Sequence, residues 1–323
     1  MSTPADRLNW INIALMVAAL AAAIIAPFHV FLFAYAVLGP LHYLTEVSWL
    51  HDRHFFTPSR THRVAWLVLV IATTIVMVIG YVSADLLQHP VAPTVEIGMF
   101  LLVFVAAVVA SYVRHPINAT AITGVAMAGI LILSPYPAYG IVAYLLITIV
   151  HVFVFTAFFI LAGAKKSRSA SGYLSFAVFV VCAAASLLVG LPFRPATGQM
   201  REIYAAFEQL NVLLLRMAGR RTSSVYDASG VGVMRFVAFA YTYHYLNWFS
   251  KTSVIRWHDV SRRRAVGILA AWAAGLVLYM FSYRIGFAVF YVLSVIHVML
   301  EFPLNHQTVA NLFRGLIPVR VHS

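Results

Sequence analysis

Successive apolar stretches of membrane-crossing length constrain this chain more than any other feature. From residue 10 to residue 303 the sequence repeats runs of roughly 17 to 25 mostly apolar residues, the length of an α-helix that crosses a bilayer. Backbone amides in lipid must be hydrogen-bonded within their own segment, so such runs predict helices. Only 10% of the residues are charged and 62% are hydrophobic, which excludes an ordinary soluble domain. The sequence therefore predicts an all-α, polytopic integral membrane bundle.

The apolar runs predict about ten transmembrane helices within one transmembrane domain, residues 1–323. The predicted spans are 10–27, 28–50, 64–84, 93–113, 117–134, 138–163, 172–191, 231–249, 265–282 and 285–303. No polar loop separates the first two runs, so a count of nine is the alternative. Residues 192–230 form a long loop on the outer side, in which "REIYAAFEQLNVLLLRM" predicts an amphipathic interfacial segment.

The positions of lysine and arginine predict the orientation of these helices. Positive residues concentrate in cytosolic loops, and here they follow even-numbered spans. They are Arg53, Arg60, Arg63, Arg114, Lys165, Lys166, Arg168, Lys251, Arg256 and Arg262 to Arg264. The loops around 85–93 and 134–137 carry none. This pattern predicts that both termini are cytosolic, in the plasma (inner) membrane, and it explains the net charge of +12 without nucleic acid as a partner.

Two segments near opposite ends of the chain share one spacing of polar residues. "HYLTEVSWLH" at 42–51 and "HVMLEFPLNH" at 297–306 both read His-x3-Glu-x4-His. Helix positions i and i+4 lie on one face, so His42 with Glu46, and His297 with Glu301, can each chelate one ion. An ionisable residue inside a span is a functional-site hypothesis by default. The single cysteine excludes a cysteine cluster, so any metal must use histidine and carboxylate.

Two further histidines complete the predicted ligand set. His151 and His244 fall within spans at a depth similar to that of His42 and His297, on the order of 10–20 Å from the cytosolic boundary at the helical rise per residue. Adding one of them to each chelating pair gives two histidines and one carboxylate per ion, the ligand set of non-haem iron. Asn247 follows His244 by one turn and is the candidate catalytic residue that orients a ligand or an oxygen intermediate.

Other polar residues near the cytosolic ends are weaker candidates. His51 and His306 end the two motifs, and a straight helix would turn them about 180° away from the first histidine. Pro303 would supply a bend in the second motif. His258 is a third weaker ligand. Asp52 and Asp259 each follow one of these histidines and are candidate hydrogen-bond partners that would orient it.

These residues predict a dinuclear iron oxygenase or oxidase acting on a lipidic substrate. Ligands at that depth are reached from the acyl-chain region, so an acyl chain, isoprenoid, carotenoid or sterol would be hydroxylated, desaturated or cleaved with dioxygen. Membrane lipids and a separate electron-donor protein are the expected partners, because the sequence contains no flavin or ferredoxin domain. Zinc is the alternative metal and would indicate a hydrolase. A proton-coupled transporter with a buried Glu–His relay is the other alternative.

In general plan the chain resembles the integral-membrane non-haem di-iron enzymes, which include desaturases, hydroxylases and alkane monooxygenases. The resemblance rests on histidines near the cytosolic ends of membrane helices and implies iron-dependent oxidation of an apolar substrate. It covers no continuous motif. The HxxxH and HxxHH boxes of those enzymes are absent, since no two histidines of this chain lie four residues apart.

Overall fold

The computed structural model describes residues 3–83, 93–113, 115–134, 136–220 and 224–313. In these residues all regular structure is helical, and eight helices are long and apolar enough to cross a membrane. The prediction of an all-helical structure is therefore confirmed, and the eight apolar helices are consistent with a helical membrane bundle. Arg114, most of the loop 85–93 and part of the loop 192–230 lie outside the described residues.

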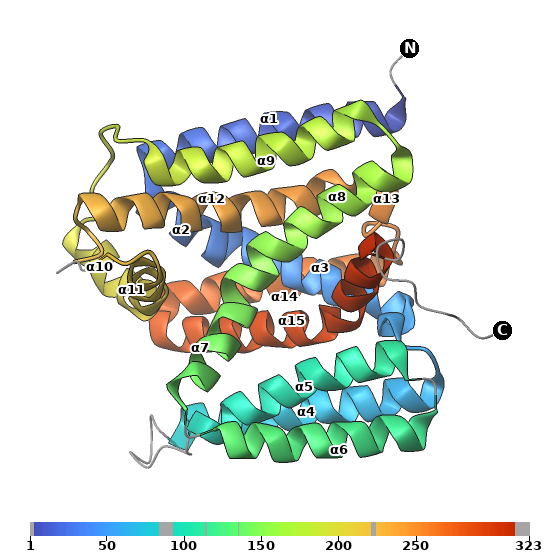
Figure 1. Ribbon diagram of the computed structural model, residues 1–323. Helices are drawn as coiled ribbons and strands as arrows, with labels where there is room; N and C mark the ends of the chain where they lie inside the picture. The colour runs from blue at the N-terminus through green and yellow to red at the C-terminus, as the bar shows by residue number, and fades with distance from the viewer. Residues whose placement is uncertain (1–2, 84–92, 114, 135, 221–223, 314–323) are drawn as a thin grey trace. The chain divides into compact units, whose positions relative to one another are not determined.

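The polypeptide divides into two compact units, whose helices carry the labels of Figure 1. The first unit comprises residues 1–42 and 152–286, and the second comprises 43–151 and 287–323. The first unit contains α1 (Pro4–Ile25), α2 (Pro27–Phe33), η1 (Ala34–Leu38), α8 (Thr156–Ser167), α9 (Ala170–Leu188), α10 (Gly198–Tyr204), η5 (Ala205–Phe207), α11 (Glu208–Met217), α12 (Ala228–Ser250), α13 (Thr252–Ile255) and α14 (Arg262–Phe281). The second contains η2 (His54–Phe56), α4 (Arg60–Val82), α5 (Pro93–Tyr112), α6 (Pro116–Leu133) and α7 (Pro137–Leu145). Three elements run from one unit into the other: α3 (Gly39–Asp52), η4 (Leu146–Phe155) and α15 (Tyr283–Phe313).

Each of the ten predicted spans corresponds to a helical stretch, but two of the ten are not among the eight apolar helices. The run 117–134 forms α6, whose apolar part, Ile117–Leu133, is short. The run 231–249 forms α12, which carries Arg235, His244 and Asn247. The number of crossings, the orientation of the termini and the single-domain organisation stay predictions.

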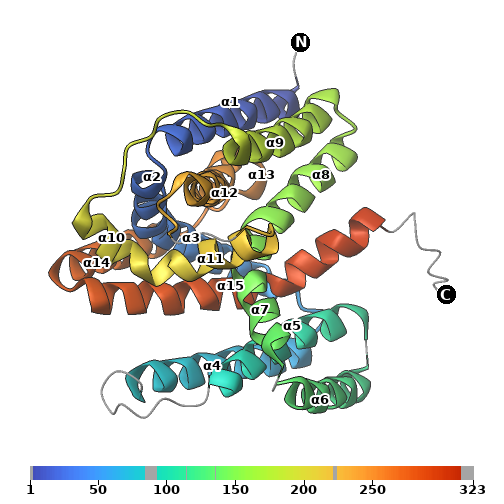
Figure 2. The same ribbon diagram turned by 60° about the vertical axis from the view of Figure 1, so that its left-hand side comes forward.

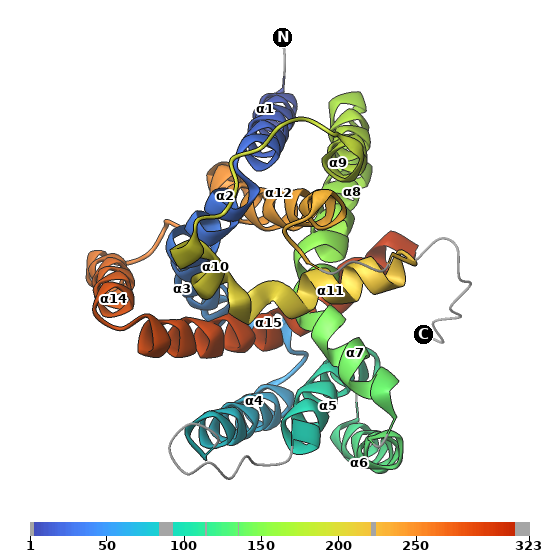
Figure 3. The ribbon, with the colours of Figure 1, turned by 90° about the vertical axis from the view of Figure 1, so that its left-hand side faces the viewer.

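In the first unit, α1 and α9 lie side by side and in parallel, and both pack on α12 (Figures 1 and 3). At the beginning of α1, the Asn9 amide donates hydrogen bonds to the hydroxyl groups of Ser169 and Ser171 at the beginning of α9. Near the C-terminal end of α12, the hydroxyl groups of Tyr243 and Ser250 donate to Asn12 Oδ1 in α1, at 3.1 and 3.0 Å. The beginnings of α1 and α9 and the C-terminal end of α12, which are the helix ends predicted to be cytosolic, thus lie together in this unit.

Arg235 joins the opposite ends of the same three helices. It lies in α12, is 3% exposed, and donates to the carbonyl of Ile24 at 3.2 Å and to those of Val189 and Leu191. The last carbonyls of a helix have no partner within it and carry partial negative charge, so a guanidinium can satisfy several of them at once. This network explains how an arginine is accommodated within an apolar bundle.

α12 is the central helix of the first unit. It contacts α1, α2, α9, α11 and η1 (Figure 3), and nearly every residue from Val231 to Trp248 is buried. Protein surrounds this helix on several sides, so it needs less apolar surface than a helix that faces lipid. That position allows α12 to carry a histidine and an asparagine in its interior.

In the second unit, α4, α5 and α6 pack in order (Figure 2). Phe302 of α15 makes edge contacts with Phe100 and Phe104 of α5, at ring-centroid distances of 5.5 and 5.1 Å. The side chain of Gln307 donates to the carbonyl of Phe56 at 2.7 Å, in the turn that follows α3. These contacts join α15 to α5 and to η2, the short turn that follows α3.

Two π-helical segments lie beside the motif histidines. η1 ends at Leu38, four residues before His42, and η4 contains His151 within ten residues of π-helix. π-helices are rare and occur frequently at functional sites, because the wider turn shifts side chains from the positions that an α-helix would give them. The sequence interpretation, which assumed α-helix throughout, did not predict these segments.

We expect Arg235→Leu to lower the free energy of unfolding by roughly 3 kcal/mol or more, because a hydrogen bond to a charged donor contributes about 1.5–3 kcal/mol and the leucine cannot donate. The thermal unfolding midpoint of the protein in detergent measures this effect. Arg216→Leu is the control, because Arg216 is exposed in the same unit. Equal midpoints for Arg235→Leu and the wild type would contradict this role of Arg235.

Candidate metal centre

Four predicted ligands converge in the second unit. Glu46 from α3, His151 from η4, and His297 and Glu301 from α15 are all buried, with exposures of 1%, 2%, 1% and 4%. His151 Nε2 lies 3.1 Å from His297 Nε2, and His151 Nδ1 lies 3.2 Å from Glu301 Oε2. The carboxyl groups of Glu46 and Glu301 are hydrogen-bonded to each other. Residues separated by up to 255 positions thus form one cluster, which we call the Glu–His cluster.

The contacts within the Glu–His cluster require protons or a cation. Two ionised carboxylates repel at hydrogen-bond distance, so the Glu46–Glu301 pair must share a proton or a positive ion. The two facing ring nitrogens of His151 and His297 likewise need a proton or a cation between them, because two lone pairs would repel. Imidazole nitrogens that bind one ion at about 2.1 Å lie about 3.0 Å apart at a right angle and roughly 3.4 Å apart in tetrahedral geometry. The observed 3.1 Å therefore fits two histidines that share one ion.

Two residues outside the predicted set support this cluster. The ring of Tyr43 stacks on that of His297, with centroids 4.1 Å apart and an interplanar angle of 21°. The amide of Asn305, which is fully buried, donates to Glu301 Oε2 at 3.2 Å. Its Oδ1 has no hydrogen-bond partner among the described residues. Asn305 follows Glu301 by four residues and so shares its face, a spacing that could have identified it from the sequence.

The other two predicted histidine ligands lie together in the first unit. The rings of His42 and His244 meet edge to face with centroids 4.9 Å apart, and both side chains are buried. The rings of Tyr245 and Trp248 lie 5.3 and 5.4 Å from His42, so its surroundings are aromatic. His244 Nδ1 is 2.8 Å from the hydroxyl of Thr156, a contact that the sequence did not predict.

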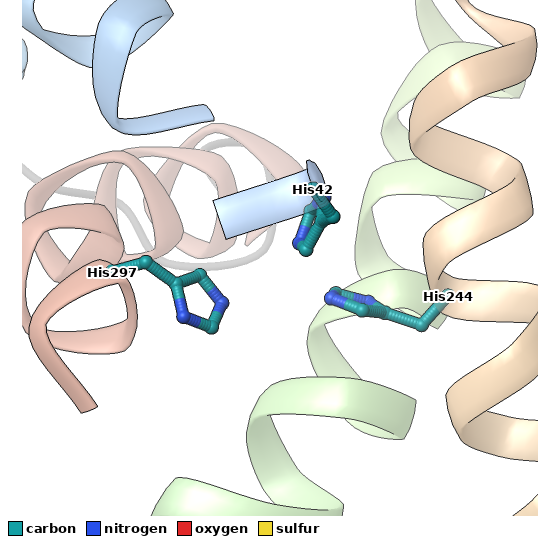
Figure 4. A group of neighbouring side chains, drawn as sticks. All are labelled: His42, His244 and His297. Carbon is teal, nitrogen blue, oxygen red and sulfur yellow. The ribbon is translucent and has the colours of Figure 1, made fainter. Parts of the chain in front are cut away.

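His42 and His244 in the first unit, and His297 in the second, are buried histidines whose ring nitrogens are of the kind that could bind a metal ion. Each offers one ring nitrogen, and Figure 4 shows their side chains. Buried imidazole is the commonest type of metal ligand in proteins. The chemistry of these side chains therefore fits a metal site, although it does not select iron over zinc.

The remaining predicted residues occupy different surroundings. Asn247 is buried in α12, and its Oδ1 has no hydrogen-bond partner among the described residues. His51 is exposed and lies 3.3 Å from Asp52. Asp259 is exposed and pairs with Arg256 at 2.5 Å, and neighbouring His258 is exposed as well.

His306 lies outside the Glu–His cluster. Its ring packs edge-on against Phe104, with centroids 4.9 Å apart. α15 continues as one helix past Pro303 to Phe313 and changes direction along its length (Figure 2). The metal-ligating roles predicted for His51, His258 and His306 stay predictions.

Comparison of the chain with models of protein families, with curated proteins and with solved structures found no match.

A covalent cross-link can test the Glu–His cluster without any metal. In a Cys182→Ala background, we expect a short bifunctional thiol reagent such as dibromobimane to join His151→Cys and His297→Cys. The two ring nitrogens of the wild type lie 3.1 Å apart, and the shorter cysteine side chains leave a gap that such a reagent spans and a disulfide does not. Loss of labelling by a thiol-reactive polymer, detected on a gel, measures the cross-link. His151→Cys with His306→Cys is the matched control, since His306 lies half a turn away from His297 around α15. Equal labelling of both pairs after reaction with the bifunctional reagent would contradict the cluster.

Proposed function

We propose that this protein is an integral-membrane, metal-dependent oxidoreductase that holds non-haem iron with histidine and glutamate ligands and oxidises a lipidic substrate with dioxygen. The observation that carries the proposal is the Glu–His cluster, in which two buried imidazoles face each other at an ion-compatible distance beside two buried carboxyl groups. Burial of so many ionisable groups is costly in a membrane bundle and indicates function over packing.

A second ion is supported by the residues of α3. This element is one continuous helix, so His42 and Glu46 lie one turn apart on one face. His42 contacts His244 in the first unit, and Glu46 contacts Glu301 in the second. The single helix α3 thus supplies one candidate ligand to the histidine pair and another to the Glu–His cluster. Six candidate ligands exceed what one ion with open coordination positions needs, which favours two ions.

Specific residues would do specific parts of this work. His151 and His297 would bind an ion through Nε2, and Glu301 would orient His151 through Nδ1 and raise its basicity. Asn305 would hold the Glu301 carboxylate in place. Bound iron with open positions supplies the activation of dioxygen, which no side chain of this chain can provide. Burial of the cluster would exclude bulk water from the reacting atoms.

The lipidic nature of the substrate follows from where these residues lie in the sequence. Most of the candidate ligands are carried by helical stretches of membrane-spanning length and apolarity, residues 27–52, 138–167 and 283–313, and the surroundings of His42 are aromatic. A substrate that dissolves in the bilayer would reach such residues from the acyl-chain region. Hydroxylation, desaturation or cleavage would draw electrons from a separate donor protein at the cytosolic side, where the predicted loops are basic.

We expect about two irons per chain in wild-type protein purified without an affinity metal, as measured by elemental mass spectrometry. His42→Ala and Glu301→Ala should each lose metal, with at least about a tenfold drop in apparent affinity, since each removes a ligand or the partner that orients one. His115→Ala removes an exposed histidine that belongs to no predicted ligand set, and this control should keep full metal content. Stoichiometric zinc without iron would contradict an iron oxygenase and indicate a zinc hydrolase. Folded wild-type protein without stoichiometric metal would contradict the proposal as a whole.

The same cluster gives a second candidate function specific support. Without a metal, Glu46, Glu301, His151 and His297 form a row of buried ionisable groups in close contact, the kind of arrangement that a proton relay coupled to transport would use. This candidate predicts no stoichiometric metal, and it predicts proton uptake by liposomes that contain the protein when a transported solute gradient is imposed. Glu301→Gln should abolish that uptake, because an amide cannot carry the proton.

A further inference from the structure

The hydroxyl of Thr156 makes two short contacts in the first unit. Its Oγ1 donates to the carbonyl oxygen of Val152 at 2.7 Å and lies 2.8 Å from Nδ1 of His244. Thr156 begins α8, directly after the π-helical segment η4, and is 2% exposed. His244 is on α12 and is also buried. Water is therefore excluded from this pair, and both contacts must be satisfied within the protein.

The two contacts together determine which nitrogen of His244 carries the proton. A carbonyl oxygen can only accept, so the single hydroxyl proton of Thr156 must point to Val152. The hydroxyl oxygen can then only accept from His244, which requires the proton on Nδ1. In a neutral imidazole the other nitrogen, Nε2, then carries the lone pair. A ring nitrogen with a lone pair is the one that binds a metal ion.

We propose that Thr156 is a positioning residue that fixes His244 as the Nδ1–H tautomer and so presents Nε2 for binding of a metal ion. This inference rests on the proposed function, because it assigns a role to one residue of the same metal site. It also parallels the second unit, where Glu301 contacts Nδ1 of His151 and leaves Nε2 facing His297. In both units a side chain from another element thus occupies Nδ1 of a histidine.

The test compares four forms of full-length, metal-free protein in detergent: wild type, Thr156→Val, Thr156→Ser and Thr148→Val. Valine has the shape of threonine but no hydroxyl, whereas serine keeps the hydroxyl. Thr148, which lies in η4 just before α8, is the matched control, because its hydroxyl likewise donates to the carbonyl four residues earlier, that of Tyr144, at 2.6 Å. Any general effect of losing a hydroxyl-to-carbonyl bond appears in both valine variants.

Two readouts separate the inference from the proposed function. Titration with cobalt(II) should show roughly 10- to 100-fold weaker binding for Thr156→Val, the range typical for loss of a residue that orients a ligand. Thr156→Ser and Thr148→Val should bind as the wild type does. Nitrogen-15 NMR of the histidine rings, with His244 assigned by His244→Gln, should show Nδ1–H in the wild type and in Thr156→Ser. Thr156→Val should gain the Nε2–H tautomer.

The outcomes point in distinct directions. Equal cobalt affinity of the wild type and Thr156→Val would overturn the inference and leave the proposed function intact. A wild type that binds no cobalt would contradict the proposed function. In that case the NMR signals still decide whether Thr156 fixes the tautomer, and an Nε2–H signal from His244 in the wild type would overturn the inference.

Discussion

The burial of two carboxyl groups side by side is the constraint on which the second unit depends. Glu46 and Glu301 are 1% and 4% exposed and are hydrogen-bonded to each other within a bundle that has few charges to compensate them. Such a pair exists only if a proton or a cation lies between its oxygens or on its neighbours. The nitrogen atoms nearest to the pair belong to three neighbours. His151 and Asn305 each place a nitrogen beside Glu301, and His297 faces His151. The buried ionisable groups of Glu46, Glu301, His151 and His297 therefore form one cluster in this unit.

Part of this network follows from sequence spacing alone. Helical periodicity places His42 with Glu46 and His297 with Glu301, and the apolar runs predict the helices that carry them. The contact between His151 and Glu301 is not available from spacing, because it joins η4 to α15 across about 150 residues of chain. Thr156 was missed for a related reason, since threonine in an apolar helix ordinarily bonds only to its own backbone and carries no signal of a histidine partner.

The π-helices show a different limit of sequence reasoning. The residues of η4 read "LITIVHVFVF", an apolar run that is equally compatible with α-helix. The structure shows the wider turn over Leu146–Phe155, with His151 inside it. A π-helix turns less per residue than an α-helix and so shifts its side chains away from the positions that α-helical periodicity predicts.

A metal site and a proton relay require different protonation states of the same side chains. A proton relay needs nitrogen and oxygen atoms that alternate as donor and acceptor, and His151 between Glu301 and His297 meets that demand. A metal site needs lone pairs that converge from ligands whose other nitrogens are occupied. His151, with Nδ1 against Glu301, and His244, with Nδ1 against Thr156, both meet this second demand. A relay does not require His244 to be locked by a hydroxyl, whereas a ligand does benefit from that lock. The Thr156 contact therefore favours the metal over the relay.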